Sequence, residues 1–218
     1  DDTDGALDMV IAYGTYATVS KTEPANFNST LEHNNLNSYV LNLGAAATVT
    51  GIGDITGKVT RNHTLANNTT YAFSNANMTL NFTDGGNASN LPTKITVIAT
   101  RGSKGLHVDK DVADNGNPAI GGVAVGRLWQ ILRTGGQAAA RFTVRFPYAE
   151  SELNSNTEGN LVTWDHHLDA PAYAGITPHE HGKTNIDVAN NFVELANNSL
   201  FYLTTEGSTT NTKYWMLS

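Results

Sequence analysis

The chain has 218 residues, of which 39% are hydrophobic and 15% are charged, and its formal net charge is −7. The basic residues are few and scattered, which argues against a nucleic-acid partner or an anionic membrane surface. Cysteine is absent, which excludes thiolate metal sites, iron–sulfur clusters and cysteine catalysis. No apolar run is long enough to span a bilayer. The first residue is Asp1, and we expect a secreted or cell-surface protein whose signal peptide has been removed.

The polar residues are mostly asparagine, threonine, serine and glycine, which are typical of β-turns and exposed strand faces rather than of helices. Segments with period-two alternation recur at roughly 8–15 residue spacing, which predicts an all-β protein, an antiparallel sandwich of the jelly-roll or immunoglobulin-like kind. A polar stretch near 103–122 leaves open a division into two stacked β units. Residues 148–153 and 187–195 are the only segments that could hold a helical turn. The expected strands are 6–19, 38–43, parts of 46–65, 70–83, 92–102, 123–132, 141–147, 160–164, 191–195, 199–205 and 213–218.

The longest alternating segment, residues 6–19, has one strongly apolar face. We therefore predict that residues 1–19 form an extension with a long strand, followed by a β-sandwich domain of residues 20–218. An exposed apolar strand promotes aggregation unless it is paired. It is expected either to pair within its own sheet or to add to the sheet of the next subunit. The side chains expected to mediate such assembly are Leu7, Met9, Ile11, Tyr13 and Val19.

Three aspartates lie close together in the polar stretch at 109–122 and are candidates for a calcium site. Asp109, Asp111 and Asp114 supply oxygen atoms of the kind that calcium prefers. Their spacing is not that of an EF-hand, and a solvated turn is the simpler interpretation. Calcium is the one cofactor that this stretch leaves open.

Histidines and aspartates gather between residues 164 and 181. His179 and His181 would point to the same face of a strand, as ligands of zinc or copper can. Asp165 or His167 would supply a third ligand. The alternative is a polar segment that is rich in histidine, since the helical H-E-x-x-H arrangement is absent.

Catalytic patterns are weak. Glu150 and Glu152 are paired carboxylates, but neighbours on one strand point the same way and cannot flank a glycosidic bond. No nucleophile elbow, P-loop or dinucleotide-binding motif occurs. We predict that the protein is not an enzyme. A polysaccharide lyase or hydrolase that uses residues 164–181 is the least favoured alternative.

Four short motifs occur in a fixed order, beginning at "TYAFSN" and "GRLWQIL" and continuing with "RFTVRFPYAESEL" and a terminal "WML". This order resembles a β-domain of large secreted and surface proteins of Bacteroidota and related bacteria. The resemblance covers about residues 50–218, and it departs from the family at Ser74, usually glycine, and at Leu128, usually aromatic. It implies an extracellular β-sandwich that is structural or adhesive, and it implies no catalytic residues. The matching residues are Tyr71, Phe73, Asn75, Arg127, Trp129, Ile131, Tyr148, Glu152, Leu153, Trp215 and Leu217.

The leading functional prediction is a structural subunit of a self-assembling bacterial surface filament or sheath. The protein would be its own partner in a pilus-like homopolymer, with residues 6–19 donated to the neighbouring subunit. The alternative is an adhesin or carbohydrate-binding module whose partners are surface glycans. Aromatic residues that could stack on sugars are Tyr71, Trp129, Tyr148, Trp164 and Trp215.

The segment around Arg127 and Trp129 has the look of a binding site, but strand alternation favours a scaffold. Both residues fall on one face of the expected strand, so Trp129 is predicted to pack in the sandwich. Arg127 is predicted to pair with Glu150 or Glu152, because a buried cation requires a partner. The residues expected to be structural are Arg127, Trp129, Tyr148, Glu152 and Trp215.

Overall fold

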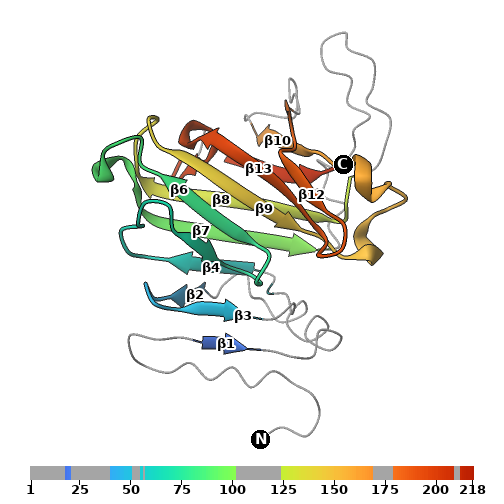
Figure 1. Cartoon of the computed structure of the whole chain (residues 1–218), viewed down its shortest axis with the longest axis horizontal. Helices are drawn as coiled ribbons and strands as arrows, with labels where there is room; N and C mark the ends of the chain where they lie inside the picture. Colours follow the sequence, from blue (N-terminus) through green and yellow to red (C-terminus); the bar gives the residue numbers. More distant parts are fainter. Residues whose placement is uncertain are drawn as a thin grey trace, which may run out of the picture.

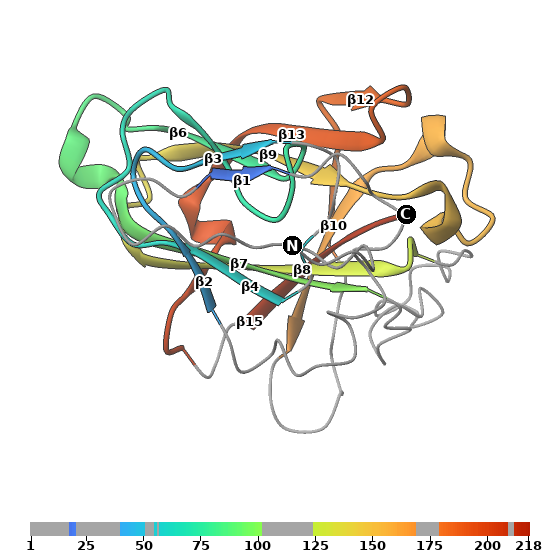
Figure 2. The same ribbon diagram turned by 90° about the horizontal axis from the view of Figure 1, so that it is seen from below.

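The computed structural model describes residues 18–20, 40–50, 55, 57–101, 124–168, 179–208 and 212–218. These residues form two β-sheets packed face to face, with only short 3₁₀ turns between strands (Figures 1 and 2). The predicted all-β sandwich is therefore confirmed. Within the described residues, no helix has the length and apolar character needed to cross a membrane.

One sheet has eight strands, in the order β11-β10-β15-β8-β7-β4-β2, with β14 beside β8. Most of its neighbours are antiparallel, whereas β2 runs parallel to β4 and β14 runs parallel to β8. The strands are β2 (Val40–Leu43), β4 (Gly57–Arg61), β7 (Pro92–Arg101), β8 (Arg127–Gly135), β10 (Thr163–Leu168), β11 (His179–Gly182), β14 (Thr204–Thr205) and β15 (Thr212–Leu217).

The other sheet has five antiparallel strands in the order β12-β13-β9-β6-β5. A separate parallel pair, β1 with β3, lies at the side of the sandwich, in the layer of this sheet (Figure 2). The strands are β1 (Thr18–Ser20), β3 (Thr48–Thr50), β5 (Thr70–Ala72), β6 (Thr79–Thr83), β9 (Arg141–Pro147), β12 (Asn185–Asp187) and β13 (Phe192–Ser199). The 3₁₀ turns are η2 (Ala88–Asn90), η3 (Glu150–Glu152), η4 (Glu158–Asn160) and η5 (Leu200–Tyr202).

The strands on either side of residues 103–122 belong to the same sheet. β7 precedes this segment and β8 follows it, and the two pair antiparallel from Pro92↔Gly135 to Arg101↔Arg127. Residues 102–123 themselves lie outside the described part of the chain. The two sequence regions considered as separate β units therefore share one sheet.

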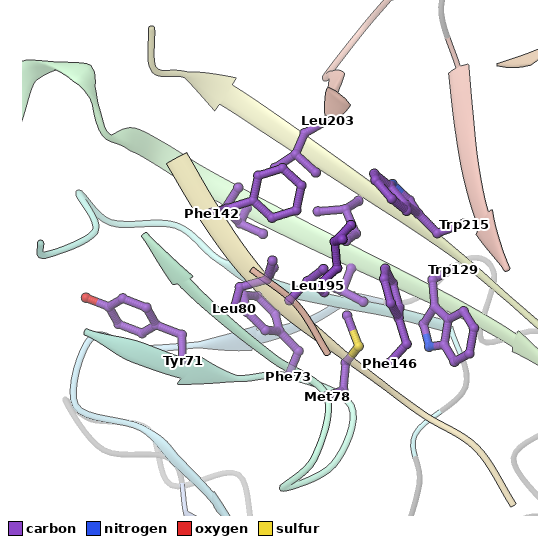
Figure 3. Close-up of a cluster of buried hydrophobic side chains, with 14 of the residues drawn as sticks. Tyr71, Phe73, Met78, Leu80, Trp129, Phe142, Phe146, Leu195, Leu203 and Trp215 are labelled. Atoms are coloured by element: carbon purple, nitrogen blue, oxygen red, sulfur yellow. The ribbon is translucent and has the colours of Figure 1, made fainter. Parts of the chain in front are cut away.

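Aromatic side chains from both sheets fill the core (Figure 3). Trp129 on β8 packs against Phe146 on β9 with ring centroids 5.0 Å apart, and Phe146 stacks on Trp215 of β15 at 5.6 Å. Trp129 and Trp215 are fully buried, so the predicted packing of Trp129 in the sandwich is confirmed. Each such ring removes a large apolar area from water and fixes the spacing of the sheets.

Two segments differ from the sequence-based expectations. The expected strand 199–205 is interrupted by η5, because the Ser199 hydroxyl accepts a hydrogen bond from the Phe201 amide and starts a turn. Residues 187–195, which could have held a helical turn, form a hairpin between β12 and β13, and the strand expected at 191–195 is part of β13. Asp187 accepts the Asn190 amide there, and Asn191 adopts a positive φ of 52°. The turn expected at 148–153 is present as η3.

Candidate functional site

Charged side chains converge on Asp165, which is buried on β10. β10 pairs with β15 on one side and with β11 on the other, so three adjacent strands contribute to this point. His179 Nδ1 lies 3.4 Å from Asp165 Oδ1, and His181 Nε2 lies 3.3 Å from Asp165 Oδ2. Lys213 Nζ lies 3.6 Å from the same Oδ2. These four residues are called the Asp165 cluster below.

The register of β10 and β15 explains why Asp165 and Lys213 meet. Asp165 stands opposite Trp215, and Lys213 is two residues before Trp215 on the same strand. Because side chains alternate along a strand, all three lie on one face of the sheet. That face is the inner one, since Trp215 belongs to the core. A lysine side chain reaches its diagonal neighbour across such a pair of strands.

Aromatic rings surround the cluster and separate its inner end from water. The His181 ring centroid lies 5.0 Å from that of Trp215 and 4.8 Å from that of Tyr202 on η5. Lys213 Nζ lies 4.8 Å from the Tyr202 ring centroid and 5.1 Å from that of Phe201. Phe201 is 70% exposed, so these contacts run from the core to the surface.

The side chains of the cluster differ in how far they are buried. The side chain of His179 is 59% exposed, whereas those of Lys213 and Asp165 are only 4% and 1% exposed. Burial lowers the pKa of Lys213, because an ammonium ion is poorly solvated there, and the Asp165 carboxylate partly opposes this shift. The cluster therefore holds an amine and a carboxyl group together in a medium of low dielectric constant.

The three residues predicted as transition-metal ligands, Asp165, His179 and His181, do come together. However, the carboxylate is also in contact with the amine of Lys213, which brings a positive charge to the place where a metal cation would bind. Among the described residues, no group of three histidine, aspartate or glutamate side chains is arranged to hold a metal ion. The geometry is that of an ion-pair cluster between strands.

Arg127 forms the predicted ion pair, and its partner is Glu152. Arg127 Nε and Nη2 donate to the two carboxylate oxygens of Glu152, each at 3.1 Å, with side-chain exposures of 3% and 7%. The Ala149 amide also donates to Glu152 at 2.9 Å. Glu152 lies on η3 rather than on a strand, so the pair ties this turn to the start of β8. The pair is therefore scaffold, as the sequence predicts.

The neighbouring carboxylate, Glu150, points elsewhere. It is exposed and accepts a hydrogen bond from Asn191 Nδ2 at 3.2 Å. Glu150 and Glu152 therefore do not face each other across a cleft, which agrees with the argument against a glycosidase pair. Tyr148 is buried beside them, and this burial, together with nearby Glu158, raises the pKa of its phenol.

Several predicted residues lie outside the described part of the chain. The calcium candidates Asp109, Asp111 and Asp114 are among them, as are the assembly residues of the N-terminal segment apart from Val19. Val19, on β1, pairs with Val49 on β3 of its own chain. Val19 was predicted to be part of the donated strand, and in the structure it belongs to the subunit's own β1–β3 pair. The assembly residues outside the described part are Leu7, Met9, Ile11 and Tyr13.

The sequence patterns do not single out Lys213, Phe201 or Tyr202. Lys213 has a detectable signal, because it alternates with Trp215 and Leu217 and must share their inward face. A lysine on an apolar strand face requires a buried partner. The contacts of Phe201 and Tyr202 depend on η5, for which the sequence offers only an apolar run.

Comparison of the chain with protein-family models, with curated proteins and with solved structures gave no match.

Proposed function

We propose that this protein is an extracellular structural subunit of a bacterial surface filament or sheath, polymerising by addition of its N-terminal strand to a neighbouring subunit. The observation that carries the proposal is the position of β1. The alternating segment 6–19 ends in this strand, and β1 belongs to neither sheet of the sandwich and pairs only with β3 among the described strands. In Figure 1, β1 is the outermost labelled strand at the lower side of the molecule.

An open strand edge on the same side supports the proposal. β2 ends the eight-stranded sheet and pairs only with β4 among the described strands. Val40 on this strand is 45% exposed. An edge strand offers unpaired amides and carbonyls to which another chain can add. Since Thr18–Ser20 pairs within its own chain, the donated part is residues 6–17, and β1 anchors the base of the donor segment.

Deletion of residues 1–17 is expected to leave a folded monomer, because it removes the donor but retains β1. The intact chain should form fibres under negative-stain electron microscopy, and the truncated chain should elute as a monomer with unchanged circular dichroism. A matched pair tests the apolar face: Ile11→Asp should block polymerisation, while Ala12→Asp, on the opposite face, should retain most of it. Fibres formed by the truncated chain would rule out strand donation.

A second function is favoured by the exposed aromatic ring of Phe201. The Tyr202 ring lies beside it, with the ring centroids 6.0 Å apart, and exposed aromatic rings of this kind can stack on sugars. This surface fits a module that binds surface glycans. The Phe201 ring, 70% exposed, would provide most of the contact with a sugar.

Phe201→Ala is expected to weaken glycan binding at least about fivefold, because one stacked ring contributes about 1 kcal/mol beyond its buried area. Glycan arrays would identify a ligand, and titration calorimetry would measure the change. Val188→Ala is the control, since Val188 is also a large exposed apolar residue but lies on the β12–β13 hairpin. Equal affinity of wild type and Phe201→Ala would exclude this surface.

A further inference from the structure

The contact between Lys213 and Asp165 joins a nucleophilic amine to a carboxyl group inside the sandwich. Lys213 Nζ and Asp165 Oδ2 are 3.6 Å apart, and both side chains are almost completely buried. The amine therefore already contacts the carboxyl group whose carbon it would attack, as proximity catalysis of amide formation requires. We propose that Lys213 and Asp165 condense into an intramolecular amide bond that cross-links β15 to β10.

The burial of Lys213 favours its uncharged form. In a medium of low dielectric constant, a proton can pass from the ammonium group of Lys213 to the carboxylate of Asp165 without any change in total charge. The pKa of Lys213 is already lowered by burial. The result is a neutral amine next to a carboxylic acid, which are the two reactants that amide formation requires.

The condensation is balanced in atoms and electrons, and it requires no oxidant and no further reactant. The Lys213 amine attacks Cγ of Asp165, a C–N bond forms, and the bond from Cγ to Oδ2 breaks. Oδ2 leaves as water, with the hydrogen of the carboxylic acid and one hydrogen of the amine. His181 Nε2 lies 3.3 Å from this departing oxygen, and His179 Nδ1 lies 3.4 Å from the oxygen that remains. With protons on these nitrogens, His181 assists departure and His179 polarises the carbonyl.

The aromatic rings of Tyr202, Phe201 and Trp215 would protect the amide bond once it has formed. They keep bulk water from the inner side of Lys213 and so disfavour hydrolysis of the product. The exposed side chain of His179 marks the side from which the released water reaches solvent. The cross-link would join the edge pair β10–β11 covalently to the strand that carries Trp215. This inference does not depend on polymerisation or on glycan binding.

Another lysine–carboxylate pair is a natural control. Lys94 Nζ lies 2.7 Å from Glu206 Oε1, closer than in the Asp165 cluster, but both side chains are substantially exposed. The Lys94 amine is in contact with solvent there, and hydrogen bonds to Lys94 and Thr134 lower the pKa of Glu206. If both proximity and burial are required, Lys94 and Glu206 should form no amide, because they are close together but exposed.

The test is the intact mass of the full chain, measured under denaturing conditions. The expected mass is about 18 Da below that of the sequence, one water, with a tryptic fragment in which the peptides of Asp165 and Lys213 are joined. Lys213→Arg and Asp165→Ala should each restore the full mass, whereas Lys94→Arg should retain the loss. His181→Gln should slow the mass loss after refolding by about a hundredfold.

Melting of the variants provides a second readout. Lys213→Arg keeps the positive charge but cannot form the amide, and it should lower the melting temperature by about 10 °C, as expected for loss of a long-loop cross-link. The decisive measurement remains the wild-type mass, which does not require any variant to fold. A folded wild-type chain with the full sequence mass and separate peptides would overturn the proposal.

Discussion

Replacement of Arg127 by methionine is expected to lower the free energy of unfolding by about 3–5 kcal/mol. The carboxylate of Glu152 would remain buried with the Ala149 amide but without the two N–H groups that Arg127 donates. An ionised group left in this way is either forced to take up a proton or drawn toward water, and both disrupt η3. Urea denaturation followed by tryptophan fluorescence would measure the loss.

The surface pair Arg145–Glu194 is the matched control for Arg127. It also joins an arginine to a glutamate, at 2.7 Å, but its side chains are 42% and 18% exposed. Arg145→Met should therefore cost no more than about 1 kcal/mol. The double variant Arg127→Met with Glu152→Met should be more stable than Arg127→Met alone, because no charge is then left buried. A loss at Arg127 equal to that at Arg145 would contradict this account.

Local patterns were sufficient to predict the sandwich and the Arg127 pair. Alternation of Arg127, Trp129 and Ile131 placed an arginine among core residues, and such an arginine needs a carboxylate. The choice between Glu150 and Glu152 could not be made from the sequence. It depends on η3, where the two side chains diverge, with one toward Arg127 and the other toward Asn191.

The abundance of asparagine also carried structural information. Asn68, Asn154, Asn191 and Asn197 all have positive φ angles, which asparagine tolerates better than most residues. Asn68, Asn154 and Asn191 lie in turns, so these turns are made by the residue type that suggested them, whereas Asn197 lies at a register shift within β13. The identity of each turn, such as the β12–β13 hairpin in place of a helical turn, depends on tertiary pairing that composition does not encode.

The Asp165 cluster illustrates the limit of sequence reasoning most clearly. Asp165, His179 and His181 attracted attention through spacing along the chain, but Lys213 joins them through the pairing of β10 with β15. That pairing connects residues far apart in sequence, and no periodic pattern specifies it. The presence of a lysine changes the chemistry expected of the cluster from metal binding to an ion pair or an amide.

Arg61 is a second buried arginine that local patterns did not identify, and it donates to backbone carbonyls where Arg127 donates to a carboxylate. It is fully buried at the end of β4, and it donates to three backbone carbonyls: Gly44 at 2.9 Å, Ala47 at 2.9 Å and Ala72 at 2.9 and 3.2 Å. Gly44 and Ala47 lie in the turn between β2 and β3. One side chain thus connects both layers of the sandwich to the turn that precedes the β1–β3 pair.

Arg61→Met is expected to lower the free energy of unfolding by about 4 kcal/mol, because it leaves three carbonyl groups without these donors. Arg61→Lys should recover only part of this, since one ammonium group cannot match the planar fork of donors. The control is Arg133→Met, expected to cost about 1 kcal/mol, because Arg133 also donates to backbone carbonyls but is only half-buried. Urea denaturation would compare the three variants.

The position of Arg61 also predicts where the structure loosens first. Amides of residues 40–50 should exchange hydrogen at least tenfold faster in Arg61→Lys, while those of β13, in the far part of the five-stranded sheet, should change little. Because β3 is the partner of β1, loss of this turn would also release β1, which precedes it in the chain and would anchor the proposed donor segment. If amide exchange became faster by the same factor in all strands, Arg61 would support the whole sandwich rather than this corner. The loss of stability would then be global and not a release of the N-terminal strand.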